Sequence, residues 1–209
     1  MIKSLKNENG RSMIEMLGVL AIIGVLSVGG IAGYSKAMQK YRINKAIEQI
    51  TLMSQNIRIF FANQKNYTGL TNNNENGRKL IKKAKLVPDE VWNADGLVNP
   101  FGGEYEIAED GYEGSIFDIR IRDLPEEACI ELALIDWSSV SSGIINIGVG
   151  PGADTIVGYD CYTTKQADTE TTGERYLCVY EESFPMSMDE VLDGCVCPNN
   201  NCQIFLSYR

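Results

Sequence analysis

Gly10 and Glu15 stand where a short basic leader meets a long apolar run. The run that starts at Met16 carries no charge before Lys36. A carboxylate at the head of a segment long enough to cross a bilayer costs about 2.5–3.5 kcal/mol on insertion scales, so it usually marks a function and needs a cationic partner. Cleavage after Gly10 would create that partner, because the new α-amino group of Arg11 lies four residues before Glu15. The alternative is an interfacial carboxylate that reaches water at the membrane surface.

The apolar run is about 20 residues long, which at 1.5 Å per residue spans the roughly 30 Å hydrocarbon layer. A secretory signal peptide has a shorter apolar core of about 7–15 residues, followed directly by a small-residue cleavage site. No Ala-x-Ala site follows the run here, and the chain continues into a helical pattern. We therefore expect a retained single membrane span over about residues 14–35.

The second half of the same helix is predicted to be amphipathic. Neither proline nor glycine occurs from Tyr34 to Phe61, so nothing interrupts a helix there. An apolar stripe recurs every three or four residues for only about three heptads, which favours a helix lying on a core over a soluble coiled coil. We expect one helix over about residues 12–63. Its stripe consists of Ile43, Ile47, Ile50, Ser54, Ile57 and Phe61.

The composition argues against several classes of function. The chain has 209 residues, a net charge of −9 and no histidine. An acidic chain is a poor general nucleic-acid binder, because phosphate contacts need clustered Lys and Arg. The missing histidine removes the commonest general base and the commonest zinc ligand. We find no nucleophile–base pair and no glycine-rich phosphate loop, so we expect no enzyme, no catalytic residue and no cofactor.

Residues 64–209 are predicted to form a globular domain of the α+β class. A long helix followed by strands and short helices indicates an antiparallel sheet laid across the amphipathic half of that helix. Turn residues and alternating apolar positions mark the elements. The expected strands are Glu104–Ile107, Ser115–Ile121, Ile144–Val149, Tyr176–Tyr180 and Ile204–Tyr208, and the expected short helices are Lys79–Leu86 and the stretch from Leu124 to Asp136.

The six cysteines all lie from Cys129 onward. An even number in a domain beyond a membrane span indicates disulfides made in an oxidising compartment, and free thiols in a cytosolic protein are the alternative. Cys195 and Cys197 are too close in sequence to pair readily with each other. A metal site at Cys195, Cys197 and Cys202 is a further alternative, but the spacing matches no standard zinc motif, so we expect no metal. The disulfide candidates are Cys129, Cys161, Cys178, Cys195, Cys197 and Cys202.

The residues around Gly10 resemble a known signal. Gly-x-x-x-x-Glu at the start of an apolar helix, behind a short basic leader, is similar to the class III signal of type IV pilins and pseudopilins. The resemblance implies that a prepilin peptidase cuts after Gly10 and N-methylates Arg11, the new first residue. It also implies that Glu15 pairs with the N-terminal amine of a neighbouring subunit during assembly. Family members usually have Phe, Met, Leu or Val at the first mature position, where this chain has Arg11.

The middle of the chain extends the resemblance to the type IVb branch of the pilins. A short helix, an Asn99-Pro100-Phe101 loop, a hairpin and a helix carrying Cys129 occur in that order. In the type IVb branch, a cysteine on this helix is disulfide-bonded to one near the C-terminus. The resemblance therefore implies that Cys129 pairs with one of Cys195, Cys197 or Cys202, while Cys161 and Cys178 would close a surface loop.

These features lead to one expected function with two alternatives. We expect a structural subunit of a type IVb-like pilus, made as a single-pass inner-membrane prepilin and assembled through its apolar helix into a homo-oligomeric filament at the cell surface. The alternatives are a minor pilin or pseudopilin serving secretion, adhesion or DNA uptake, and an anchored extracytoplasmic domain that never assembles. The expected partners are the prepilin peptidase, the assembly machinery and the membrane, with no nucleic acid. Residues 1–10 would form the cleaved leader, residues 11–63 the helix and residues 64–209 the head.

Overall fold

The structure is a computed structural model that describes residues 13–94, 96–151, 161–162 and 176–209. Helix α1 runs without a break from Met13 to Phe61, which confirms the predicted helix to within two residues at each end. The chain divides into two compact units at residues 41 and 42. The described part of the first unit is the start of α1, and the second unit holds the rest of α1 and every other element.

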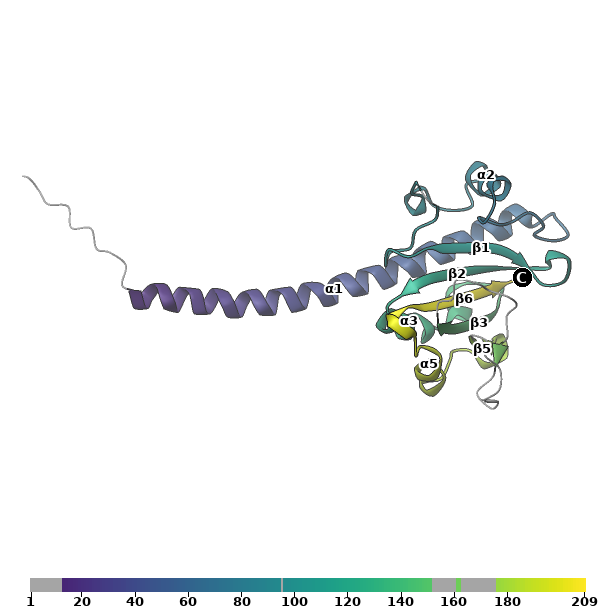
Figure 1. Cartoon of the computed structure of the whole chain (residues 1–209). Coiled ribbons are helices and arrows are strands. Elements are labelled where there is room, and N and C mark those ends of the chain that lie inside the picture. Colours follow the sequence, from purple (N-terminus) through teal and green to yellow (C-terminus); the bar gives the residue numbers. More distant parts are fainter. Residues whose placement is uncertain (1–12, 95, 152–160, 163–175) are drawn as a thin grey trace, which may run out of the picture. The chain divides into compact units, whose positions relative to one another are not determined.

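The second unit is built on one six-stranded sheet with the order β1-β2-β6-β3-β5-β4 (Figure 1). The first five strands of this order pair antiparallel, and the two-residue β4 adds to β5 in parallel. Strand β6 lies between β2 and β3, which are far from it in sequence. The five predicted strands are confirmed as β1 at Tyr105–Asp110, β2 at Ile116–Leu124, β3 at Ile144–Pro151, β5 at Tyr176–Tyr180 and β6 at Cys202–Tyr208. The short strand β4 at Cys161–Tyr162 was not predicted.

Short helices flank the sheet. Helix α2 begins earlier than predicted because the Asn74 side chain caps it, accepting a hydrogen bond from the Gly77 amide at 2.8 Å. The stretch predicted as one helix after Leu124 is two, because the chain turns between Ala133 and Trp137. The bounds are Glu75–Lys83 for α2, Glu126–Ala133 for α3, Trp137–Val140 for α4 and Met188–Gly194 for α5, with short 3-10 helices at Asp89–Val91, Tyr112–Gly114, Glu181–Ser183 and Pro198–Asn200.

The core lies between the second half of α1 and one face of the sheet. The predicted apolar stripe is buried except at Ile47, which is only partly buried. Alternate residues of β2 point to the same core, because neighbouring side chains of a strand face opposite sides of the sheet. The buried positions of α1 are Ile43, Ala46, Gln49, Ile50, Met53, Ser54, Ile57 and Phe61, and those of β2 that belong to this core include Phe117, Ile119 and Ile121.

Polar side chains of α1 fix the helix to particular points of the sheet. The Tyr105 hydroxyl donates a hydrogen bond to Gln49 Oε1 at 3.0 Å, inside the core. Arg58 Nε donates to the Arg209 carbonyl at 3.0 Å, and Arg58 Nη1 donates to the Ser142 carbonyl at 2.8 Å. Gly143, with φ +79°, permits this contact, since a Cβ there would lie 2.6 Å from Arg58 Cζ. The register between helix and sheet therefore depends on hydrogen bonds as well as on apolar burial.

The Asn-Pro-Phe loop is organised by the buried amide of Asn99. Asn99 Nδ2 donates to the carbonyls of Arg122 and Glu104 at 2.8 and 3.2 Å. Asn99 Oδ1 accepts from the amides of Phe101 and Gly103 at 2.9 and 3.2 Å. The side chain thus uses both of its donors and its acceptor to join the loop to the end of β2, which explains why an asparagine stands at this position.

Candidate assembly segment and disulfide cluster

Glu15 lies in the first turn of α1 and places a carboxylate at the start of the apolar half of this helix. A carboxylate here is favoured by the amide groups of the helix N-terminus. Gly10 and Arg11, the predicted cleavage and methylation positions, lie outside the described residues. The geometry of a cleaved N-terminus against Glu15 therefore stays a prediction.

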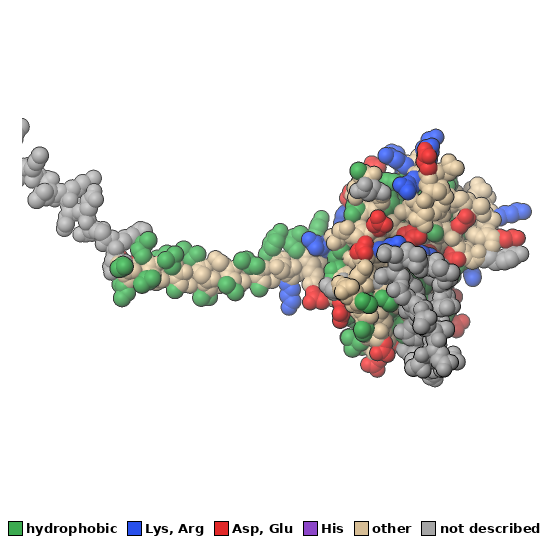
Figure 2. All heavy atoms as spheres, viewed as in Figure 1, with side chains coloured by type: hydrophobic (Ala, Val, Ile, Leu, Met, Phe, Trp, Pro, Cys, Tyr) green, Lys and Arg blue, Asp and Glu red, His purple; other side chains and the backbone are tan. Residues whose placement is uncertain are grey.

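Every residue of α1 from Met13 to Ile31 is exposed, so apolar side chains are uncovered all around this part of the helix. Figure 2 shows them on the side in view. By length and composition, α1 is the one helix in the described part of the chain that could cross a membrane. Large aliphatic side chains left uncovered around a whole helix need a lipid or protein environment. The exposed set is Met13, Ile14, Met16, Leu17, Val19, Leu20, Ile22, Ile23, Val25, Leu26, Val28 and Ile31.

Two disulfides are resolved in the C-terminal part of the head. Cys129 of α3 is bonded to Cys195 at the end of α5, with Cα atoms 5.9 Å apart, which selects one of the three partners expected for Cys129. A second disulfide joins Cys197 to Cys202 across five residues, with Cα atoms 5.2 Å apart. Cys178 is also disulfide-bonded. The predicted pairing of Cys178 with Cys161 involves a side chain outside the described residues.

The sulfur atoms of the two resolved disulfides form a cluster. The Sγ atoms of Cys129, Cys197 and Cys202 all lie within 4.8 Å of one another. Such a group has the spacing of a soft metal site, but metal ligation by cysteine requires thiolates. In the disulfide form none of these sulfurs is a thiolate, so the cluster acts as a pair of covalent cross-links.

The face of the sheet opposite α1 carries buried polar side chains. Asp118, Arg120 and Gln203 lie there at 1%, 6% and 0% exposure, in strands whose alternate residues fill the core. Arg120 lies between two carboxylates, with Nη1 at 3.4 Å from Glu106 Oε1 and Nη2 at 3.7 Å from Asp118 Oδ2. Burial raises the pKa of Asp118 to about 7, and Asp110 adds to this rise, while Ser207 and Arg120 oppose it.

Asp118→Asn is expected to change how stability depends on pH. Asp118 binds its proton more tightly in the folded chain than at its ordinary pKa of 3.8. The free energy of unfolding should therefore fall as the pH rises from about 4 to about 7, with a slope of up to about 1.4 kcal/mol per pH unit. An asparagine side chain cannot titrate, so the variant should lose this slope.

The measurement is urea unfolding of the full chain in a non-ionic detergent, followed by the fluorescence of its two tryptophans, Trp92 and the buried Trp137. Asp89→Asn is the matched control, because it removes an exposed carboxylate of the same domain and should keep the slope. An unchanged slope in Asp118→Asn would contradict the assignment.

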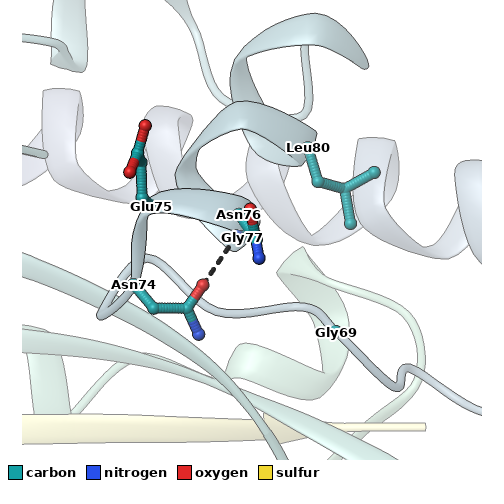
Figure 3. A pocket seen from close by; sticks show the side chains of 6 residues that line it. All are labelled: Gly69, Asn74, Glu75, Asn76, Gly77 and Leu80. Carbon is teal, nitrogen blue, oxygen red and sulfur yellow. Dashed lines mark hydrogen bonds between the residues drawn. The ribbon is translucent and has the colours of Figure 1, made fainter.

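A pocket lies at the start of α2 (Figure 3). Of its polar side chains, Asn74 caps the helix and Glu75 forms an ion pair with Lys79. Gly77 packs directly on the chain, since a Cβ there would lie 1.9 Å from the Thr71 carbonyl oxygen. We assign this pocket to helix capping and close packing. It is lined by Gly69, Asn74, Glu75, Asn76, Gly77 and Leu80.

Comparison with known proteins decides the family. A family model described as "PilS N terminal" matches residues 40–178. The chain is a type IV pilin of this family. Major structural subunits of the bundle-forming pilus from Escherichia coli O127:H6 and O111:H- are each 23% identical to it over 145 residues, covering 68% of this chain and 72% of theirs.

The fold of this pilin also matches a solved pilin structure. TcpA, a type IV pilin from the El Tor biotype of Vibrio cholerae, aligns with a TM-score of 0.53 at 16% identity. The match covers 81% of this chain and 99% of that one. The long helix and the antiparallel sheet with its disulfide confirm the predicted α+β class. The family and the fold are those of structural proteins.

Sequence reasoning missed helix α5, which positions Cys195 in this pilin. The helix begins with a capping box, because Ser187 Oγ accepts from the Glu190 amide at 3.3 Å while Glu190 Oε2 accepts from the Ser187 amide at 2.7 Å. Ser-x-x-Glu before apolar residues is a recognisable helix start, so the signal was present in the sequence. The Cys197–Cys202 pair carried no comparable signal, since it depends on the turn between α5 and β6.

Proposed function

We propose that this pilin is a filament subunit that is made as a prepilin, cut after Gly10 and N-methylated at Arg11. The inner membrane holds the prepilin through residues 14–35 until the subunit joins a growing filament. After assembly the subunit is part of a pilus at the cell surface. The proposal assigns residues 1–10 to a cleaved leader, residues 11–63 to the helix and residues 64–209 to the head. Its partners are further copies of the same chain, the prepilin peptidase and the assembly machinery.

The exposed apolar half of α1 is the observation that carries the proposal. In a bilayer these side chains have an apolar solvent, so leaving the membrane costs free energy unless another apolar surface covers them. Fully burying one large aliphatic side chain is worth about 1.5–3 kcal/mol relative to water. Copies of the same helix supply such a surface, and the family of this chain consists of pilins.

Glu15 supplies the selectivity of assembly in this proposal. Apolar packing between helices in lipid is weakly directional, whereas an ion pair at low dielectric depends strongly on distance. Glu15 lies in the first turn of α1, four residues after the proposed N-terminal amine. An ion pair between Glu15 of one subunit and the amine of its neighbour would fix the axial position of one helix against the other. The guanidinium of Arg11 is a second cation available to Glu15 at the same end.

The comparison with the bundle-forming pilus favours a major subunit over a minor one. That relative is a major structural subunit, and the alignment with this chain extends over 72% of its length. We therefore propose a pilus-building role first, and a minor pilin or pseudopilin serving secretion, adhesion or DNA uptake second. An anchored domain that never assembles is the remaining alternative.

The test is intact mass and N-terminal sequencing of the chain from sheared surface filaments and from membranes. The proposal expects abundant chain in the sheared fraction, beginning at Arg11 and carrying one N-methyl group. Trace amounts in filaments would favour the minor-subunit role. Chains that keep residues 1–10 and occur only in membranes would overturn the proposal in favour of a permanent anchor.

A further inference from the structure

Four cysteines meet where α3, α5 and β6 come together. Cys129 lies in α3, Cys195 directly follows α5 as its C-cap, Cys197 comes two residues later, and Cys202 is the first residue of β6. Cys129–Cys195 cross-links positions 66 residues apart, whereas Cys197–Cys202 closes a short loop. Because Cys129 Sγ lies within 4.8 Å of both sulfurs of the second disulfide, the two cross-links lie against each other.

The four cysteines differ in how deeply they are buried. Cys129, Cys195 and Cys202 are buried, at no more than 1% exposure. Cys197 is only partly buried and follows Val196, which is 69% exposed. A thiol in solution must approach a disulfide sulfur directly, so access limits the rate of exchange. Cys197 Sγ itself lies 3.7 Å from the Gly150 carbonyl oxygen, but Cys197 is the one cysteine of the four that is not fully buried, so Cys197–Cys202 is the disulfide that a thiol reaches with the smaller local opening.

Buried Cys202 is held next to the first disulfide. Its Sγ lies 3.5 Å from the carbonyl oxygen of Cys195 and within 4.8 Å of Cys129 Sγ. Cys202 begins β6, which pairs with both β2 and β3, so its backbone is fixed on two sides. A thiolate formed at Cys202 would therefore stay beside the Cys129–Cys195 bond.

We propose that Cys197 is a thiol-exchange site and that the Cys197–Cys202 disulfide relays exchange from a thiol in solution to the buried Cys129–Cys195 disulfide. In the first step an incoming thiolate bonds to Cys197 Sγ, and the Cys197–Cys202 bond breaks to leave a Cys202 thiolate. In the second step Cys202 Sγ bonds to Cys129 Sγ, and Cys195 leaves as a thiolate that takes a proton from water. Each step forms one disulfide bond and breaks one, so no external oxidant is needed.

This property is independent of filament assembly, because it depends only on sulfurs of the head. It gives the chain a route to correct or exchange a disulfide that is otherwise closed to solvent. Without the relay, Cys129–Cys195 would exchange only after the head opens, and its rate would follow the opening of the fold.

The first test is Cys197→Ser, which leaves Cys202 as a free thiol without any added reductant. The purified full chain is held in detergent at about pH 8, where thiolate forms, and is then alkylated and mapped by mass spectrometry. The expected result is a share of Cys129–Cys202 cross-link on the order of a tenth or more, with Cys195 alkylated. Chains with only Cys129–Cys195 and alkylated Cys202 would overturn the proposal.

The second test follows reduction of Cys129–Cys195 by glutathione in the folded full chain. In Cys197→Ser/Cys202→Ser, reduction should be roughly tenfold or more slower than in the natural chain and should accelerate with mild denaturant. Val196→Ser is the matched control, since it alters the exposed loop but keeps every sulfur, and it should react at the natural rate. Equal or faster reduction in the double variant would mean that the second disulfide only shields the first, and would overturn the relay.

Discussion

Glu15→Ala is expected to leave the subunit in the membrane and to abolish filaments. Glu15 is the acidic residue of the first turn of α1, at the head of an exposed apolar surface. In the proposed filament it pairs with a neighbour's N-terminal amine in apolar surroundings. If that pair contributes about 2–3 kcal/mol, its loss lowers the equilibrium for subunit addition roughly 30- to 150-fold.

Two further variants separate charge from folding. Glu15→Gln keeps the size of the side chain but removes its charge, and it should fail to assemble as Glu15→Ala does. Glu48→Ala removes an exposed carboxylate from the second half of the same helix, where Glu48 pairs with Lys45. This variant should still form filaments. The readouts are immunoblots of sheared and membrane fractions, together with intact mass to confirm that cleavage still occurs. Normal filaments from both Glu15 variants would contradict the proposed role.

Removing the Cys129–Cys195 disulfide should destabilise the head more than removing Cys197–Cys202. The first closes a segment of 66 residues, which in the chain-entropy account is worth about 4 kcal/mol. The second closes five residues, worth about 2 kcal/mol in the same account. We expect Cys129→Ser/Cys195→Ser to lower the free energy of unfolding by about twice as much as Cys197→Ser/Cys202→Ser.

Urea unfolding of the full chain in non-ionic detergent, read from tryptophan fluorescence, measures both variants under one condition. Each double variant replaces two sulfurs by hydroxyls in the same cluster, so each is the matched control for the other. The reverse order of stabilities would show that strain or packing, rather than loop length, determines what these disulfides contribute.

The sequence predicted the fold well where local pattern decides it. The second half of α1 follows from a stretch without proline or glycine and from a stripe of helical period, and the predicted bounds of β5, Tyr176–Tyr180, are the observed ones. Strand ends shifted by a few residues elsewhere, because pairing with β6 extends β2 to Leu124 and β3 to Pro151. Tertiary contacts, rather than propensity, set those ends.

The parts that the sequence could not predict depend on contacts between distant segments. Asp118 stands in an alternating strand, where an acidic residue suggests a solvent-facing position, yet it is 1% exposed. Alternation identifies the two faces of a strand but not whether both are covered. The sequence does not decide which of three cysteines pairs with Cys129, because only the position of α5 in the fold brings Cys195 to α3.

The position of β6 has a consequence for how the head is made. Ile119 pairs with Leu206, and Leu206 pairs with Ile147. The middle of the sheet therefore cannot form until β6 is synthesised, which happens long after β2 and β3. Pairings this distant in sequence form slowly. Until residues 202–208 arrive, β2 and β3 each present an open edge that another chain could pair with. During synthesis the nascent head therefore passes through a period in which it needs protection from its own copies.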